Sequence, residues 1–153
     1  MAELDSYDRR ILAALQADAR VTMTALAEQV ALSPTQCARR LQRLESAGLV
    51  AGYGARLDRV KAGWSVMVLV AVALERHGEA RAEAFHQAVR RLPEVIECLL
   101  LTGDSDYQLR VVAPDLEAYA RFVTDTLMRL PGVASIRSGV VLTEVKGLSP
   151  LPV

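Results

Sequence analysis

A five-residue motif occurs twice in the C-terminal half of the chain and constrains the fold more than any other feature. Arg-Leu-Pro-Glu-Val at 91–95 recurs 38 residues later as Arg-Leu-Pro-Gly-Val at 129–133. In each copy a helical pattern ends at proline, which cannot continue a helix, and a strand pattern begins at valine. Each copy therefore marks the step from helix to strand in a β-α-β unit, and the chain carries two such units in succession.

Strand and helix patterns alternate around the two motifs. Apolar, valine-rich runs predict strands, and apolar residues at helical spacing predict helices. The expected order is a strand at 64–74, a helix at 79–92, strands at 95–102 and 107–113, a helix capped by Asp115, and a strand at 133–145. This β-α-β-β-α-β order predicts an α+β, ferredoxin-like domain whose antiparallel sheet carries both helices on one face.

The first predicted strand is apolar on both faces. Residues 64–74 form a nearly continuous apolar run, whereas a strand with one face in water alternates apolar and polar residues. The sheet face without helices is therefore expected to be covered by protein. A second copy of the chain is the simplest cover, which predicts a symmetric homodimer.

The N-terminal segment predicts a helix-turn-helix. Apolar residues at helical spacing indicate a first helix, and Thr22 can cap a second. The third helix has the strongest start signal, because Ser33 suits the cap, Pro34 suits the first position and Gln36 completes a capping box. The break between the second and third helices spans only residues 31–32, which is typical of this motif.

Composition and charge divide the chain into three parts. The 18 basic and 18 acidic residues cancel, which excludes a protein that coats nucleic acid or membrane through high net charge. Residues 1–62 carry a small basic excess and residues 63–153 a small acidic excess. The predicted domains are a helix-turn-helix at 1–50, a glycine-containing wing and linker at 51–63, and a ferredoxin-like domain at 64–153. Two short strands are expected within 49–57, with Tyr53 packed against the third helix.

The cellular compartment is expected to be the cytoplasm. Two cysteines, Cys37 and Cys98, cannot make a disulfide framework or a zinc cluster, and both are expected to be core residues. No signal peptide is visible, and the longest apolar stretch is shorter than the ~20 residues that a membrane-spanning helix needs. His77 and His86 have no partner at metal-ligand spacing, and no catalytic motif is present. The chain is therefore expected not to be an enzyme and to hold no cofactor or metal.

The outward face of the predicted third helix is rich in arginine and glutamine. Arginine can bind guanine with two hydrogen bonds, and glutamine can do the same with adenine. A solvated amphipathic helix would look similar, but the helix-turn-helix context favours double-stranded DNA. Base contacts are expected from Thr35, Gln36, Arg39 and Arg43, and phosphate contacts from Arg40, Arg56 and Arg59. Together with the cap residue, the predicted DNA-binding set is Ser33, Thr35, Gln36, Arg39, Arg40, Arg43, Arg56 and Arg59.

Four stretches give the chain a resemblance to a known family. They are residues 4–12, 32–41 and 103–111, and the ending from 130–133 through 143–146. Together they resemble the Lrp/AsnC (leucine-responsive/asparagine-operon) transcription regulators over nearly the whole chain. The resemblance implies a winged DNA-binding head, a ferredoxin-like effector domain and dimers that assemble further, often to octamers. It also implies a small effector, usually an amino acid, near the loop between the second and third strands.

That loop spans residues 102–107 in this sequence. Backbone N–H groups around Gly103 can bind an α-carboxylate, and Asp106 can bind an α-ammonium group. The same residues are also good hairpin-turn formers without any ligand. Ser105 departs from the aromatic residue that is frequent in the family, and Gln36 replaces a common proline. The expected effector-binding residues are Thr102, Gly103, Asp104, Asp106, Tyr107 and, by resemblance, Ser138.

The predicted function is a sequence-specific DNA-binding transcription regulator modulated by a small effector, and the expected effector is an amino acid. Two alternatives remain open at this point. An architectural protein would bind DNA without responding to an effector. A ferredoxin-like regulatory domain of metabolism would not bind DNA.

Overall fold

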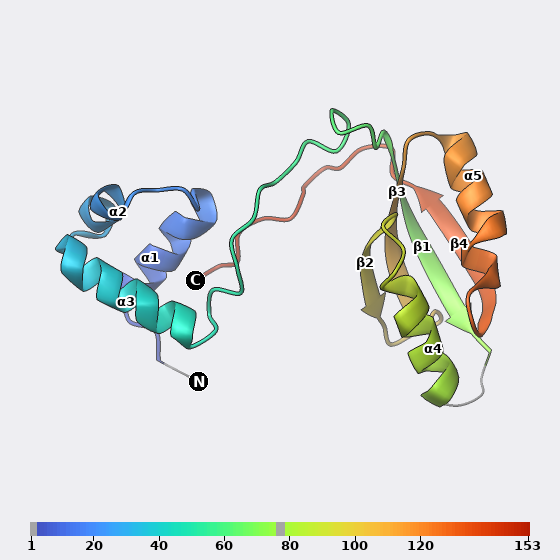
Figure 1. Ribbon diagram of the computed structural model, residues 1–153, viewed down its shortest axis with the longest axis horizontal. Helices are drawn as coiled ribbons and strands as arrows, with labels where there is room; N and C mark the ends of the chain where they lie inside the picture. The colour runs from blue at the N-terminus through green and yellow to red at the C-terminus, as the bar shows by residue number, and fades with distance from the viewer. Residues whose placement is uncertain (1–2, 76–78) are drawn as a thin grey trace. The chain divides into compact units, whose positions relative to one another are not determined.

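The computed structural model describes residues 3–75 and 79–153 (Figure 1). Their contacts form two compact units. The first contains the chain up to Arg56 together with Val145–Val153, and the second contains Leu57–Glu144. Within the described residues, no helix is both long and apolar enough to cross a membrane.

The first unit contains the three predicted helices, α1 (Ser6–Ala17), α2 (Met23–Val30) and α3 (Pro34–Ser46). Each begins at a side-chain cap, which binds backbone N–H groups that the first turn leaves without partners. Thr22 caps α2, and the predicted capping box between Ser33 and Gln36 is present at α3. The core of the unit contains Cys37, as predicted, and buried apolar residues from all three helices, namely Ile11, Leu12, Leu26, Ala27, Val30 and Leu44.

The two strands expected within residues 49–57 are not formed. The chain after α3 is irregular through residue 58. An isolated hairpin is only marginally stable, and Gly52 and Gly54 weaken any strand that contains them. The Arg56 side chain in this segment donates a hydrogen bond to the backbone oxygen of Leu148 at 3.1 Å. Residues 51–57 are therefore an extended segment in this structure.

The second unit has the predicted β-α-β-β-α-β order. Its sheet has the order β2-β3-β1-β4, and every neighbouring pair is antiparallel. The two repeated motifs lie where predicted, because one precedes β2 and the other precedes β4. The elements are β1 (Val66–Leu74), α4 (Glu79–Val89), β2 (Val95–Leu100), β3 (Tyr107–Ala113), α5 (Leu116–Asp125), the short 3₁₀ helix η1 (Leu127–Arg129) and β4 (Val133–Val140).

The sheet of the second unit has one buried face. Val68, Val70 and Val72 alternate along β1 and pack with Phe85 of α4 and Tyr119 of α5. Side chains at the intervening positions point to the opposite face. That face keeps apolar residues in contact with water, among them Leu69 of β1 at 40% exposed and Leu99 of β2 at 47% exposed.

The last strand is shorter than predicted. The strand expected at 133–145 ends at Val140, and Val145–Val153 make their contacts with the first unit rather than with the sheet. Pro150 and Pro152 cannot donate to a strand ladder, so this end of the chain is poorly suited to extend β4. The segment is an extended tail instead.

Candidate DNA-binding and effector sites

The exposed face of α3 presents the predicted base-reading side chains. Thr35, Arg39 and Arg43 are all exposed. The Ser33 hydroxyl and backbone N–H both donate to the side-chain oxygen of Gln36, at 3.0 and 3.3 Å. The cap thus uses the oxygen of the Gln36 amide and fixes the first turn of α3, where a recognition helix contacts base edges.

A buried carboxylate, Asp8 of α1, lies beneath the arginines of α3. Asp8 is 0% exposed. It accepts hydrogen bonds from Arg40 Nη1 at 2.9 Å and from Arg43 Nη2, and it also accepts from the backbone N–H of Asp5. A buried charge is tolerated only when it is paired and hydrogen-bonded, and here two guanidinium groups pair with it. Asp8 therefore fixes two side chains of the candidate DNA-binding face.

The role of Asp8 was not predicted from the sequence. It lies three, four and seven residues before Ile11, Leu12 and Leu15, so it shares the apolar face of α1. An acidic residue on the buried face of a helix requires a basic partner. That spacing is the signal that could have revealed it.

Arg40 connects α1 to α3. Its Nη1 also donates to Asp5 Oδ2 at 2.7 Å, and its guanidinium lies 5.3 Å from the ring centroid of Tyr7. The hydrogen bonds to Asp5 and then Asp8 raise the pKa of Arg40. The backbone N–H of Asp8, followed by the Arg40 guanidinium, lowers the pKa of the Asp5 carboxyl. Only a quarter of the Arg40 side chain is exposed, because its guanidinium is held by these contacts. The structure therefore adds no support for the phosphate contact predicted for Arg40.

A basic concavity lies beside this network. It has a volume of about 360 Å³ and is lined by Asp5, Arg39, Arg40 and Arg43. Arg43 keeps 59% of its side chain exposed although it pairs with Asp8. The concavity presents planar donor groups suited to a phosphate or a base edge.

The two linker arginines bind backbone carbonyls. Arg56 donates to Leu148 within the first unit, and Arg59 donates to Trp64 within the second. Both were predicted to bind phosphate, and the structure places only Arg56 in the same unit as α3. Their phosphate contacts stay predictions.

Tyr53 contacts the third helix, as predicted. Its hydroxyl donates to Glu45 Oε1 at 2.6 Å. The hydrogen bond to this carboxylate, followed by burial, raises the pKa of Tyr53 to about 12. The contact ties the segment after α3 to the end of that helix.

Alkaline titration tests the Tyr53 contact. Because the pKa is raised on folding, the contact contributes fully to stability below the ordinary value of 10.0 and is lost as the pH rises through about 12. We expect the ultraviolet difference between wild type and Tyr53→Phe to show one phenol that ionises near pH 12. The control is Tyr7→Phe. A Tyr53 phenol that ionises near its ordinary pKa would contradict the contact.

The loop between β2 and β3 is closed by backbone and side-chain bonds. The N–H of Leu101 donates to the backbone oxygen of Asp106 at 2.8 Å. Asp106 Oδ2 accepts from the N–H of Leu74 at 2.7 Å, which joins the loop to the end of β1. Gly103 has a φ of +131°, a conformation that favours glycine. The predicted residues Thr102 and Asp104 flank this glycine and are exposed.

Two predicted effector residues point toward the helices instead. Tyr107 is 3% exposed, packs its ring 4.7 Å from that of Phe85, and shares a 2.8 Å hydrogen bond with His86 Nε2. Burial raises the pKa of its hydroxyl. Ser138 of β4 bonds to the hydroxyl of Tyr119 on α5 at 2.5 Å. The structure therefore does not bring the side chains of Tyr107 and Ser138 together with the loop.

Arg137 reaches the loop in place of Ser138. Its Nη2 donates to Ser105 Oγ at 3.3 Å. Adjacent residues of a strand point to opposite faces, so a shift of one position along β4 changes which side chain faces the loop. The effector contact expected of Ser138 stays a prediction, and Arg137 joins the candidate residues at the loop.

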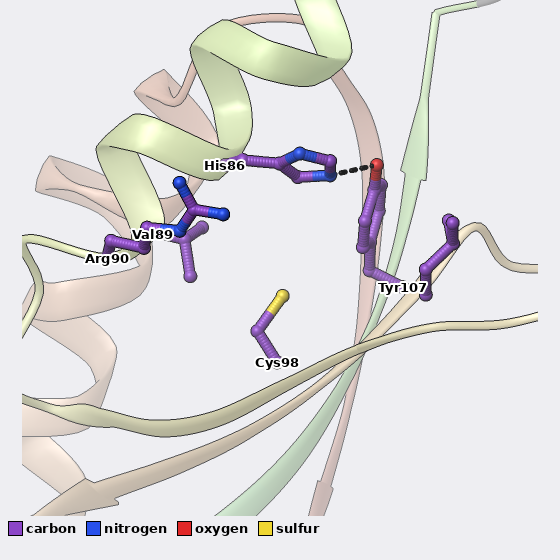
Figure 2. A pocket seen from close by; sticks show the side chains of 6 residues that line it. His86, Val89, Arg90, Cys98 and Tyr107 are labelled. Carbon is purple, nitrogen blue, oxygen red and sulfur yellow. Dashed lines mark hydrogen bonds between the residues drawn. The ribbon is translucent and has the colours of Figure 1, made fainter.

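A small pocket lies between α4 and the β2-β3 edge of the sheet (Figure 2). It has a volume of about 250 Å³. Cys98 was expected in the core, but it is an exposed residue of the edge strand. Partial burial of its thiol raises the pKa of that group. Within the described residues no group of three potential metal ligands occurs, and His77 lies outside those residues. The pocket is lined by His86, Val89, Arg90, Cys98, Leu100 and Tyr107.

Comparison with known proteins assigns both halves of the chain. The family model of the winged helix-turn-helix DNA-binding domain matches residues 4–51, and that of the Lrp/AsnC ligand binding domain matches residues 67–151. The leucine-responsive regulatory protein of Escherichia coli K12 is 43% identical over 144 residues, which are 94% of this chain and 88% of that protein. The chain belongs to the Lrp/AsnC family.

Solved structures of Lrp/AsnC regulators confirm the predicted fold class. A transcriptional regulator from Neisseria meningitidis in complex with L-methionine has a TM-score of 0.94 at 41% identity, covering 98% of this chain and 97% of that one. An AsnC family regulator from Agrobacterium tumefaciens has a TM-score of 0.92 at 35% identity, covering 97% of each chain.

These matches also decide the general function. The Lrp/AsnC chain described here is a DNA-binding transcriptional regulator with a ligand-binding domain. The resemblance found in the sequence is confirmed. The alternative of a metabolic regulatory domain that does not bind DNA is not supported, because the N-terminal unit matches a DNA-binding family.

Proposed function

We propose that this Lrp/AsnC regulator binds DNA through the exposed face of α3 and that an amino acid modulates the binding. The observation that carries the DNA-binding half is the buried Asp8, which fixes Arg40 and Arg43 beside the exposed Arg39. Thr35, Arg39 and Arg43 contact bases in this proposal. Arg56 and Arg59 contact phosphates.

The effector is an amino acid bound at the loop between β2 and β3. The Neisseria relative was solved in complex with L-methionine, which supports this class of ligand. The backbone around Gly103 would bind the α-carboxylate, and the Asp106 carboxylate would bind the α-ammonium group. Arg137 and Ser105 form a second polar pair at the loop. A response to this ligand would distinguish the regulator from an architectural protein, which binds DNA without responding to an effector.

The regulator is proposed to act as a homodimer in the cytoplasm, without catalysis and without a cofactor. The exposed apolar residues Leu69 and Leu99 on the open sheet face support burial against a second copy. Two copies place two heads on paired half-sites of DNA. Assembly of such dimers to octamers is part of the proposal through the family alone.

Fluorescence anisotropy tests the proposed function. The purified chain is titrated against DNA from upstream of its own gene and against random DNA, over a range of salt concentrations. Steep salt dependence with preference for the upstream DNA is the expected result. A pool of the twenty amino acids is expected to shift the affinity. Absence of DNA binding at low salt would contradict the role of α3, and specific binding without a shift would contradict the effector role.

The Asp106→Asn variant separates the effector role from the turn. Asparagine keeps an oxygen that accepts from the Leu74 N–H, but it lacks the charge that attracts an ammonium group. We expect unchanged DNA affinity without amino acids and an effector affinity lower by about tenfold. Anisotropy against effector concentration measures both, with Asp104→Asn as the control. An unaltered effector response would assign Asp106 to the turn alone.

A further inference from the structure

The C-terminal tail contacts α1 through the side chain of one glutamine. Gln16 Nε2 donates to the backbone oxygen of Leu151 at 3.1 Å, and the N–H of Leu151 donates to Gln16 Oε1 at 2.6 Å. A primary amide that pairs with both polar groups of one residue reproduces the pairing of neighbouring β-strands. The two residues are 135 positions apart in the sequence.

The tail forms one wall of an apolar groove in the first unit. The groove has a volume of about 360 Å³, and its other walls come from residues 4–19 and 49–54. Leu151 and Val153 contribute to its lining. The Arg56 hydrogen bond to the oxygen of Leu148 holds the tail at a further point. Residues 148–153 are thus bound along their length by the same unit that carries α3.

The sequence of the tail suits an extended, bound segment. Pro150 and Pro152 flank Leu151 and restrict the unbound chain to extended conformations, which reduces the entropy lost on binding. Neither proline has an N–H, so Leu151 supplies the only donor between them, and Gln16 accepts it. The Leu151 side chain is 73% exposed and that of Val153 is 39% exposed. Side-chain burial is therefore small, and the affinity depends on the hydrogen bonds and on the covalent tether.

We propose that residues 148–153 are a latch that binds the first unit through Gln16 and Arg56 and joins the ligand-binding domain to the DNA-binding unit. The linker after residue 56 is one covalent connection between the units, and the chain after β4 is a second. β4 carries Arg137, which contacts Ser105 in the effector loop. A change at that loop can therefore reach the DNA-binding unit through β4 and the latch. The regulatory part of this inference rests on the proposed effector function.

A peptide experiment tests the latch without DNA or effector. A variant that ends at Gly147 is titrated with the peptide Leu-Ser-Pro-Leu-Pro-Val, and nuclear magnetic resonance follows the side-chain amide of Gln16. We expect saturable shifts with a dissociation constant on the order of 1 mM, because a tethered segment needs little intrinsic affinity. The control peptide carries N-methyl-leucine in place of Leu151, which replaces the N–H donor with a methyl group. Its affinity, and that of the full peptide for a Gln16→Leu form of the variant, is expected to fall about tenfold.

Two results of this titration would overturn the latch. One is the absence of any shift up to about 10 mM peptide, a concentration above that expected for a useful tethered contact. The other is equal binding of the N-methylated peptide, which would show that the Gln16 pairing is not used.

The full-length Gln16→Leu variant tests the regulatory role. We expect its DNA affinity without amino acids to stay within about twofold of wild type, and its response to amino acids to fall at least about threefold. Gln87→Leu on α4 is the control, since it makes the same chemical change in the other unit. Circular dichroism confirms that both variants are folded. A response of Gln16→Leu to amino acids equal to that of wild type would refute coupling through the latch. If wild type itself does not respond to amino acids, the effector proposal is refuted, and the peptide titration still tests binding of the latch.

Discussion

Replacing Asp8 with alanine is expected to lower the free energy of unfolding of the DNA-binding unit by about 3 kcal/mol. The substitution leaves two guanidinium groups without their shared anion and opens a hole at a fully buried position. Arg43 is more than half exposed and can return to water, so the loss falls at the lower end of the range for a broken buried ion pair. Urea denaturation followed by far-ultraviolet circular dichroism measures the change.

The same substitution is expected to weaken DNA binding even under conditions in which the variant is still folded. Arg40 and Arg43 lose the contact that orients them, so the face of α3 is no longer preorganised. Glu28→Ala is the matched control because it removes one acidic charge from an exposed position of the same unit. A stability within about 0.5 kcal/mol of wild type in Asp8→Ala would show that the network is not important for folding.

Local signals in the sequence predicted most of the fold. The repeated motif located both helix-to-strand steps, and the capping box at Ser33 located the start of α3. These features act over three to five residues, so a linear pattern contains them. The two strands expected within residues 49–57 are absent for the opposite reason. A hairpin needs a partner surface, and nothing in these residues specifies one.

The candidate site was harder to predict because it depends on contacts between distant residues. Helix phase placed Arg39 and Arg40 on one face, but only the folded unit shows that Arg40 is held by two carboxylates from α1. Similarly, strand alternation leaves open which of Arg137 and Ser138 faces the effector loop, since that depends on the register against β1. Such pairings span 30 residues or more and have no local signature.

The C-terminal tail shows the same limit. Its leucines and prolines read as an end of the ferredoxin-like domain, because they follow the last predicted strand. The partner that binds them is a single polar side chain, Gln16, on the first helix of the chain. An exposed glutamine on a helix is ordinarily unremarkable, so its role emerges only when both ends of the chain are seen together.

Replacing Arg39 with alanine is expected to weaken binding to the preferred DNA by about 1–3 kcal/mol, or roughly 5- to 150-fold. Arg39 is exposed on α3, beside the concavity that Arg40 and Arg43 also line. Within residues 3–75 and 79–153, no hydrogen bond or ion pair commits its guanidinium to another part of the protein. It is therefore ready to bind a base edge, whereas Arg40 is not.

Comparison of DNA variants distinguishes a base contact from a phosphate contact at Arg39. If the side chain reads a base, Arg39→Ala loses preference at one position of the site and binds variants of that position equally. If it binds a phosphate, affinity falls alike for every sequence and the salt dependence decreases by about one unit. Arg9→Ala on α1 removes the same charge from the same unit and controls for net charge. Unchanged affinity of Arg39→Ala for every DNA variant would remove this residue from the interface.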